Sequence, residues 1–206
     1  MPTASSCAGS PVEQLIAGTL GSRDGVAEGL VLPSRVFIVG YGNSLRGDDG
    51  VGQEVARELW RQRGQSAELA AASIDWAHQL APEMAPELAA SSLGIFVDAA
   101  GGGRPAGAVT VEVLGLGLEG RSDGQARAAV AAGVGCWEDL GPWQLLTLAF
   151  ELYGNAPPAA LVSVGVGSLE LGAGLSPAVE AAVPRAVAVV RLLLAAERHR
   201  QAALSG

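Results

Sequence analysis

Three short segments of the chain contain carboxylates and a histidine, side chains that commonly bind metal ions. They hold the pairs Asp48 and Asp49, Asp75 and His78, and Glu138 and Asp139. Each pair stands at the end of an expected strand or just before an expected helix, so all three are expected in loops. Mixed oxygen and nitrogen ligands suit zinc, nickel or a similar ion. The pattern therefore indicates a metal-binding site built from separate loops.

A plainer interpretation stays open for each pair. Asp48 and Asp49 precede an expected helix, which one aspartate can cap and stabilise by about 0.5–2 kcal/mol. A second carboxylate repels the first and needs a counter-charge, which a bound cation supplies. Glu138 and Asp139 also precede an expected helix, and a lone histidine such as His78 is commonly structural.

Patterns for other kinds of chemistry are weak in this chain. Gly40-Tyr41-Gly42 begins like a dinucleotide-binding loop, but Leu45 occupies the place of the third glycine. No serine lies in a G-x-S-x-G pattern, and Cys136 has no neighbouring general base. The chain contains no lysine, so it lacks the phosphate-binding residue of a P-loop.

An alternating series of strands and helices must position the candidate ligands. An apolar, β-branched run at 36–39 predicts a strand, and Val51, Val55 and Leu59 recur at helical spacing after it. Further strands are expected at 69–74, 94–98, 109–114 and 160–166, and further helices at 82–90, 143–153 and from Ser176 onward, the last bent at Pro184. This order predicts an α/β fold of three layers, with a mostly parallel twisted sheet of about five strands between helices on both faces. Ligands usually bind at the carboxyl edge of such a sheet.

Length and composition limit the classes of protein that fit. The 206 residues are expected to form one domain at 34–206, preceded by a poorly ordered extension at 1–33, and 115–135 are expected to form a surface loop. The net charge of −8 argues against a nucleic-acid partner. No apolar run reaches about 18 residues and no secretory signal is visible, which argues against a membrane partner. The two cysteines, Cys7 and Cys136, form no disulfide framework and fit the reducing cytoplasm.

The loop after the first strand carries a longer pattern. Residues 40–52 match, at every fixed position, the pattern G-x-G-N-x-L-x-x-D-D/E-x-x-G, and so resemble the signature of the nickel–iron hydrogenase maturation proteases. Later segments agree in order: H-Q-L-A-P-E at 78–83, F-V-D-A at 96–99 and L-G-A-G-L-S-P at 171–177. The resemblance extends over about residues 35–195.

This resemblance implies an endopeptidase that removes a short C-terminal extension from the large-subunit precursor of a nickel–iron hydrogenase after nickel insertion. Nickel carried by the precursor would be recognised by Asp49, by His78 or Asp75, and by a third ligand, and zinc or cadmium could replace it in vitro. The family has a histidine at the third position, where this chain has Asp139, and the H-Q-L sequence favours His78 over Asp75. The implied catalytic set is Asp49, His78 and Asp139, and the implied substrate contacts are Gly42, Asn43 and Asp48.

Two other functions stay open. Because carboxylate is a harder ligand than imidazole, Asp139 is also compatible with a protein that binds the immature large subunit without cutting it. A small-molecule hydrolase or nucleotide binder on a similar sheet is the third interpretation. The protein is expected to act as a cytoplasmic monomer whose partner is the large-subunit precursor.

Overall fold

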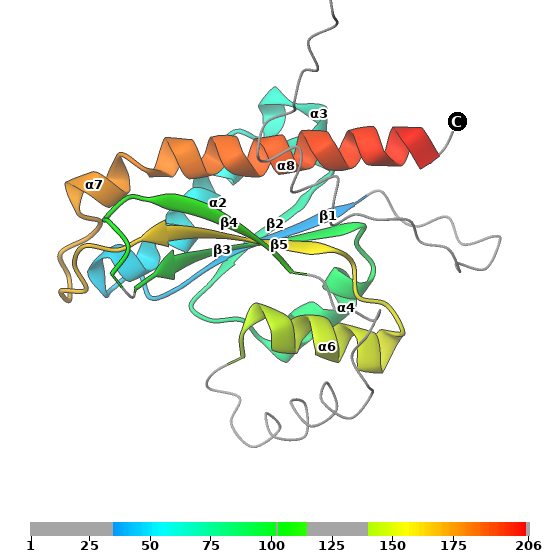
Figure 1. Ribbon diagram of the computed structural model, residues 1–206, viewed down its shortest axis with the longest axis horizontal. Helices are drawn as coiled ribbons and strands as arrows, with labels where there is room; N and C mark the ends of the chain where they lie inside the picture. The colour runs from blue at the N-terminus through cyan, green and yellow to red at the C-terminus, as the bar shows by residue number, and fades with distance from the viewer. Residues whose placement is uncertain (1–34, 102, 115–139, 205–206) are drawn as a thin grey trace, which may run out of the picture.

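The computed structural model describes residues 35–101, 103–114 and 140–204, which form three layers (Figure 1). A sheet of five strands lies between helices on both faces. The expectations for 1–33 and 115–135, and those for Cys136, Glu138 and Asp139, lie outside the described residues.

The sheet is mostly parallel, as the sequence predicts. It consists of β1 (Val36–Tyr41), β2 (Ser73–Ala77), β3 (Leu93–Ala100), β4 (Val109–Leu114) and β5 (Ala159–Gly165), in the order β2-β1-β3-β5-β4. Only β4 runs antiparallel to its neighbour, β5, among the strands of the described residues. β1, β3 and β5 are covered on both faces, which explains their continuous apolar sequences, whereas the edge strand β4 alternates between more and less exposed residues.

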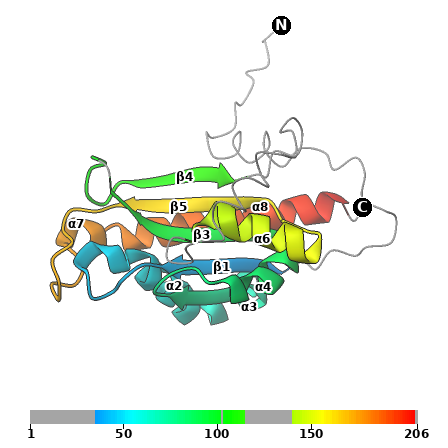
Figure 2. The ribbon, with the colours of Figure 1, turned by 90° about the horizontal axis from the view of Figure 1, so that it is seen from below.

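Helices of different length cover the two faces of the sheet (Figures 1 and 2). On one face lie α2 (Val51–Arg61), α3 (Ala67–Ala71) and α8 (Val183–Leu204), and on the other lie α4 (Ala85–Ala89) and α6 (Pro142–Tyr153). The short elements η1 (Gly47–Gly50), η2 (Arg63–Gln65), η3 (Pro82–Met84) and α7 (Pro177–Glu180) lie in the connections. Within the described part of the chain, no helix combines the length and apolar character needed to cross a membrane.

Each face of the sheet has its own hydrophobic core. Ile38 and Ile95 pack toward α2 and α8, in a cluster with Val55 and Val190. Phe37 and Phe96 pack toward α4 and α6, with ring centroids 6.3 Å apart in an edge-to-face arrangement. Alternation of side chains along a strand thus decides which layer each residue stabilises.

The start of α2 lies directly on the sheet because Gly52 has no side chain. A Cβ atom at Gly52 would lie 2.4 Å from the carbonyl oxygens of both Tyr41 and Val97. Real Cβ atoms do not approach oxygen so closely, so any larger residue would lift the helix away. The close contact presses the preceding turn, η1, against the ends of β1 and β3.

Two local expectations are wrong. The segment expected as a strand at 69–74 is helical up to Ala71, and β2 begins only at Ser73. Alanine favours the helix, and the Ser66 hydroxyl caps it by accepting a hydrogen bond from the Leu69 amide at 3.3 Å. The single helix expected from Ser176 onward, bent at Pro184, is instead two helices, since α7 ends at Glu180 and α8 begins at Val183. Pro184 lies in the first turn of α8, where its missing N–H has no cost. The other expected strands and helices within the described residues are confirmed, with ends shifted by a few residues.

Candidate active site

The carboxyl ends of β1, β2 and β3 meet at one edge of the sheet, on the left in Figure 1. Tyr41 pairs with Ala77, so the loops after β1 and β2 leave the sheet side by side. The Gly42 amide donates a hydrogen bond to the His78 carbonyl oxygen at 3.2 Å. The loop with the two aspartates and the loop with the histidine are therefore in direct contact.

Gly42 directly follows β1 and contacts the backbone of both His78 and Asp49. Its φ of +130° lies in a region that favours glycine, and a Cβ atom there would lie 2.0 Å from the Asp49 carbonyl oxygen. The backbone of Asp49 can therefore approach β1 only because residue 42 is glycine. This explains the glycine of the sequence pattern without a bound nucleotide.

Asp49 is half-buried and has one hydrogen-bond partner for its carboxylate among the described residues. Its Oδ2 atom accepts a hydrogen bond from the Asn43 amide at 2.9 Å. The Asn43 side chain is itself held, since its Oδ1 atom accepts a hydrogen bond from the Leu45 amide at 2.9 Å. The carboxylate of Asp49 thus has a defined position and unused acceptor capacity.

Asp48 has the opposite environment. Its side chain is fully buried, and its two oxygens accept hydrogen bonds from the amides of Gly167, Ser168 and Ser176 and from the Ser176 hydroxyl, at 2.5–2.9 Å. Burial raises the pKa of the Asp48 carboxyl, but the hydrogen bonds from Ser176, Ser168 and Gly167 together outweigh burial and hold the pKa below its usual value. Asp48 therefore fastens the loop after β5 to η1.

The capping interpretation of the two aspartates is wrong. Neither η1 nor α2 has a side-chain hydrogen bond at its N-cap, and the residue at the N-cap of α2 is Gly50. Both aspartates lie inside η1, one turn before the α-helix begins. Their side chains leave that turn toward different parts of the molecule.

A third aspartate, Asp98, lies at the same edge and was not among the candidate residues predicted from the sequence. It belongs to β3 and shares a face of the sheet with Tyr41, whose hydroxyl forms a hydrogen bond with it. Burial raises the pKa of Asp98 to about 6, and the nearby negative charge of Asp49 adds to the increase, while hydrogen bonds from Tyr41 and the Ala99 amide oppose it. Burial and the charge of Asp98 in turn raise the pKa of Tyr41 above its usual value.

A signal for Asp98 was present in the sequence. The F-V-D-A segment at 96–99 places an aspartate near the end of an apolar strand. What was missing was the strand order, because only the pairing of β1 with β3 brings Asp98 beside Tyr41. The sheet thus places a carboxyl group with a raised pKa close to Asp49.

The other predicted ligands lie at different distances from the edge. Asp75 pairs with Val39, two residues before the end of β2, which places it about 6–7 Å back along the strand. It is exposed, and its Oδ1 atom accepts a hydrogen bond from the Trp76 amide at 2.8 Å. His78 is exposed and directly follows β2, beside Gly42. The backbone therefore brings His78, rather than Asp75, next to the turn that holds Asp49.

In residues 35–101, 103–114 and 140–204, no group of three or more His, Cys, Asp or Glu side chains lies close enough together to hold a metal ion. The predicted third ligand, Asp139, lies outside these ranges. The three-ligand set of Asp49, His78 and Asp139 therefore stays a prediction.

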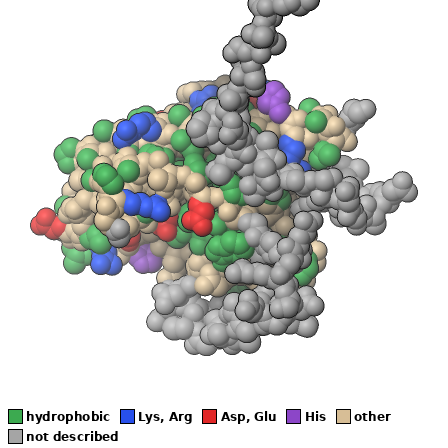
Figure 3. All heavy atoms as spheres, in the orientation of Figure 1, with side chains coloured by type: hydrophobic (Ala, Val, Ile, Leu, Met, Phe, Trp, Pro, Cys, Tyr) green, Lys and Arg blue, Asp and Glu red, His purple; other side chains and the backbone are tan. Residues whose placement is uncertain are grey.

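Exposed leucines border the candidate site. Leu45 and Leu171 are 71% and 77% exposed, and the Gly172 amide donates a hydrogen bond to the Leu45 carbonyl oxygen at 2.8 Å. The loop after β5 thus runs along the loop after β1. Figure 3 shows hydrophobic side chains among charged ones at this end of the molecule.

A cavity of about 590 Å³ lies beside α2 and adjoins the turn that holds Asp49, since Ser44, Gly47 and Gly50 are among its lining residues. It lies between α2 and the segment that leads into α8, and its lining includes Glu54, Arg57 and Glu180 but neither Asp49 nor His78. Glu54 is paired there with Arg57 and Arg61 of the same helix.

Comparison with known proteins supplies structural relatives. No protein-family model matches the sequence, and no curated protein gives a significant sequence match. A hydrogenase 2 maturation peptidase from Thaumarchaeota archaeon SCGC_AB-539-E09 has a similar structure, with 25% identity, coverage of 79% of this chain and 99% of the other, and a TM-score of 0.53.

Two further structures agree. The hydrogenase maturation protease HycI from Thermococcus kodakarensis KOD1 has 21% identity and a TM-score of 0.54, covering 80% of this chain and 93% of the other. The hydrogenase maturating endopeptidase HybD from E. coli has 22% identity and a TM-score of 0.50, covering 78% and 91%. The described fold is thus that of the hydrogenase maturation peptidases, and the resemblance indicated by residues 40–52 is confirmed.

Proposed function

We propose that this protein is an endopeptidase that removes the C-terminal extension of a nickel–iron hydrogenase large-subunit precursor after nickel insertion. The observation that carries the proposal is the contact between the Gly42–Asp49 turn and His78 at the carboxyl edge of a sheet shared with the maturation peptidases. This contact brings together two segments, 40–52 and 78–83, that carry the sequence resemblance.

The nickel belongs to the precursor and acts as the recognition element. Asp49 has free acceptor capacity, and His78 is exposed beside it, so these two side chains are the proposed contacts of the nickel. Asp139 is the proposed third contact, and Asp75 is the alternative to His78. Zinc or cadmium in the precursor would be recognised by the same oxygen and nitrogen ligands.

The proposed reaction is hydrolysis of one peptide bond. The C–N bond breaks, the hydroxyl group of water joins the carbonyl carbon, and the new amine takes up a proton. Nickel held in the precursor would supply a Lewis acid able to polarise the carbonyl or activate the water. Gly42 and Asn43, whose backbone borders Asp49, are the proposed contacts of the peptide.

Asp48 is not included among the proposed substrate contacts, although the sequence resemblance implied one. Its carboxylate is fully buried and accepts the hydrogen bonds that fasten the loop after β5. A contact with substrate would require the breaking of these bonds. The proposed role of Asp48 is therefore to hold the loop that borders the site.

A binding factor that recognises the immature large subunit without cutting it is the second candidate. The observation that favours it is the replacement of the family's histidine by Asp139. A carboxylate binds nickel less readily than imidazole does, which would weaken the third contact. We further propose the cytoplasm as the compartment and a monomer as the active form.

One incubation separates the two candidates. Purified protein is mixed with nickel-loaded precursor and with nickel-free precursor, and the mass of the precursor is followed with time. The proposal predicts a single loss of mass at the C-terminus of the nickel-loaded form only. Stable co-purification with an unchanged mass, while a related peptidase cuts the same sample, would contradict the protease and support the binding factor.

A further inference from the structure

The peptide group between Gly42 and Asn43 is held at both ends. Its carbonyl oxygen accepts a hydrogen bond from Gln53 Nε2 at 2.5 Å, and its N–H donates to Asp49 Oδ2 at 2.9 Å. In a trans peptide these two groups point in opposite directions. Gln53 and Asp49 therefore hold the same rigid plane from opposite sides, and rotation of the plane would disturb both bonds.

Gln53 is itself fixed in position. Its side chain belongs to α2 and is only 6% exposed. Its Oε1 atom accepts a hydrogen bond from Arg57 Nη2 at 2.5 Å, one helical turn further along α2. The side-chain NH₂ group of Gln53 thus faces the Gly42 carbonyl oxygen, and its side-chain oxygen faces the Arg57 guanidinium. These two partners fix the orientation of the amide, because only its nitrogen can donate and only its oxygen can accept.

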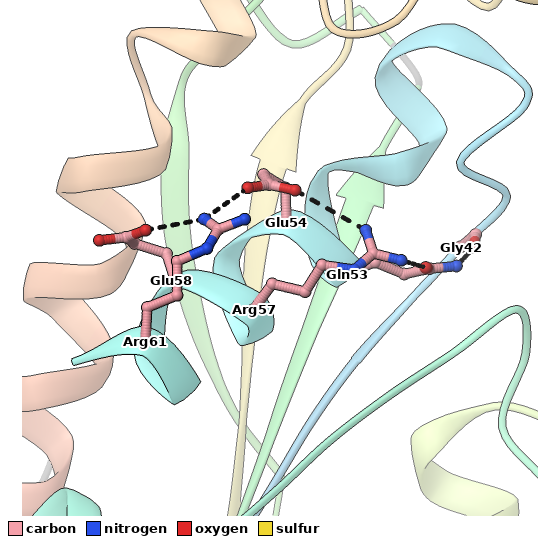
Figure 4. Close-up of polar contacts among 6 residues, drawn as sticks. All are labelled: Gly42, Gln53, Glu54, Arg57, Glu58 and Arg61. Carbon is pink, nitrogen blue, oxygen red and sulfur yellow. Dashed lines mark hydrogen bonds and ion pairs between the residues drawn. The ribbon is translucent and has the colours of Figure 1, made fainter. Parts of the chain in front are cut away.

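Arg57 is anchored by groups outside the site. Its guanidinium lies 3.7 Å from a carboxylate oxygen of Glu54 and 5.9 Å from the centre of the Trp76 ring on β2. Glu54 also pairs with Arg61 at 2.9 Å. Figure 4 shows the hydrogen bonds and ion pairs as one continuous series from Arg61 through Glu54, Arg57 and Gln53 to Gly42.

We propose that Gln53 is a positioning residue that sets the direction of the Asp49 carboxylate through the Gly42–Asn43 peptide group. The inference rests on the proposed function, since it is Asp49 that would meet the nickel of the precursor. A carboxylate that must contact one ion needs a fixed orientation, and residues behind such ligands commonly provide it. Arg57 supports the same arrangement by holding the Gln53 side chain.

The role requires the chemistry of an amide. Gln53 donates to Gly42 and accepts from Arg57 at the same time, which neither methionine nor glutamate can do. Methionine has a similar length and preserves the packing but loses both bonds. Glutamate keeps an oxygen for Arg57 but, when ionised, turns a second oxygen toward the Gly42 carbonyl and repels it.

The test compares Gln53→Met with Gln62→Met. Gln62, directly after α2, also donates through Nε2, to Glu58 Oε1 at 2.7 Å, and its Oε1 atom accepts a hydrogen bond from Arg191 Nη1 at 3.3 Å. Because these partners belong to α2 and α8 rather than to the Gly42 loop, Gln62→Met controls for loss of an amide in the same region. Two quantities are measured: kcat and KM for nickel-loaded precursor, and hydrogen exchange of the Asn43 amide.

Gln53→Met is expected to lower kcat by roughly 10-fold to 100-fold with little change in KM, the range found when partners behind a metal ligand are removed. Exchange of the Asn43 amide should become about 10-fold faster, which corresponds to a loss of about 1.4 kcal/mol from its hydrogen bond. Gln62→Met should match the wild type in both measurements. Should Gln53→Met fold poorly, Gln53→Glu gives the same test with the original side-chain shape.

A Gln53 variant with wild-type kcat and wild-type Asn43 exchange would overturn the inference. If the wild-type protein does not cleave the precursor, the proposed function fails, but amide exchange still decides whether Gln53 holds the peptide that binds Asp49. If the inference alone fails, the wild type and the Gln53 variant will cleave the precursor at the same rate, and their Asn43 amides will exchange hydrogen at the same rate.

Discussion

Asp48 and Asp49 are adjacent in the sequence, yet their carboxylates lie in two regions of the molecule with opposite environments. Asp48 is fully buried against the loop after β5, where four hydrogen bonds saturate it. Asp49 is half-buried at the edge of the sheet, where one backbone amide binds it. The difference shows how one short turn can separate an acid that holds a loop in place from an acid with unused acceptor capacity. The 3₁₀ turn directs successive side chains apart, so adjacency does not imply a shared ion.

The largest expected difference between the two acids is in catalysis. We expect Asp49→Ala to lower the rate of precursor cleavage by about 100-fold or more, since loss of a group acting on the reacting atoms has effects of this size. Its thermal unfolding should change little, because the Asp49 carboxylate is half-buried and has one hydrogen-bond partner among the residues that the structure describes. Cleavage rates and melting temperatures measured on the same preparation test this. A variant that processes the precursor at full rate would remove Asp49 from the site.

The buried acid should affect stability instead. Asp48→Ala removes a fully buried carboxylate and leaves three partly buried amides without their acceptor, and we expect it to lower the free energy of unfolding by about 3–5 kcal/mol. Urea unfolding followed by circular dichroism measures this effect. An unchanged midpoint would contradict the anchoring role, and Glu170→Ala, at an exposed position on the same loop, is the control.

The anchoring by Asp48 should also depend on pH. The pKa of Asp48 in the folded protein lies below its ordinary value of 3.8, so the unfolded chain takes up its proton first as the pH falls. The stability from Asp48 is complete above the unfolded pKa and disappears as the pH falls through the lower, folded pKa. The difference in stability between wild type and Asp48→Ala should therefore shrink below about pH 4. A constant difference from pH 7 to pH 2 would contradict this account.

A smaller effect with the opposite sign is expected from Asp98. Burial raises its pKa in the folded protein to about 6, so the folded state binds this proton more tightly than the unfolded chain does. Asp98 therefore makes the protein less stable as the pH rises from about 4 to about 6. Asp98→Asn removes this dependence and should raise the melting temperature at pH 7 relative to the wild type. Parallel melting curves at pH 4.5 and pH 7 test the prediction, and an equal gap at both values would contradict it.

Much of the fold could be predicted because its signals are local. Apolar runs identified β1, β3 and β5, and helical spacing identified α2. The strand expected at 69–74 was wrong because an alanine-rich segment carries no strong signal for a strand, and the cap at Ser66 decided for a helix. The order of the strands depends on contacts between distant segments, which a local pattern does not record.

The candidate site divides in the same way. The pattern at 40–52 identified the turn of Gly42, Asn43 and Asp49, because the conformation of this turn depends on these residue types. Gly42 leaves room for the Asp49 carbonyl oxygen, and the side chains of Asn43 and Asp49 accept hydrogen bonds from backbone amides of the same turn. The separate role of Asp48 could not be predicted, since its partners lie about 120 residues further along the chain. Asp98 lies beside Tyr41 because β1 pairs with β3, and Gln53 reaches the Gly42 carbonyl oxygen because α2 packs against the end of β1. Both arrangements depend on contacts between segments that a local sequence pattern does not record.

We propose that the side chains of Asp49 and His78 contact one and the same ion at the carboxyl edge of the sheet. Rates of cleavage of nickel-loaded precursor by Asp49→Ala, His78→Ala and the double variant test it most directly, because groups that act as a unit have non-additive effects. We predict that the double variant is no slower than the slower single variant. A double variant whose loss equals the product of the two single losses would show that the residues act independently and would contradict the shared site.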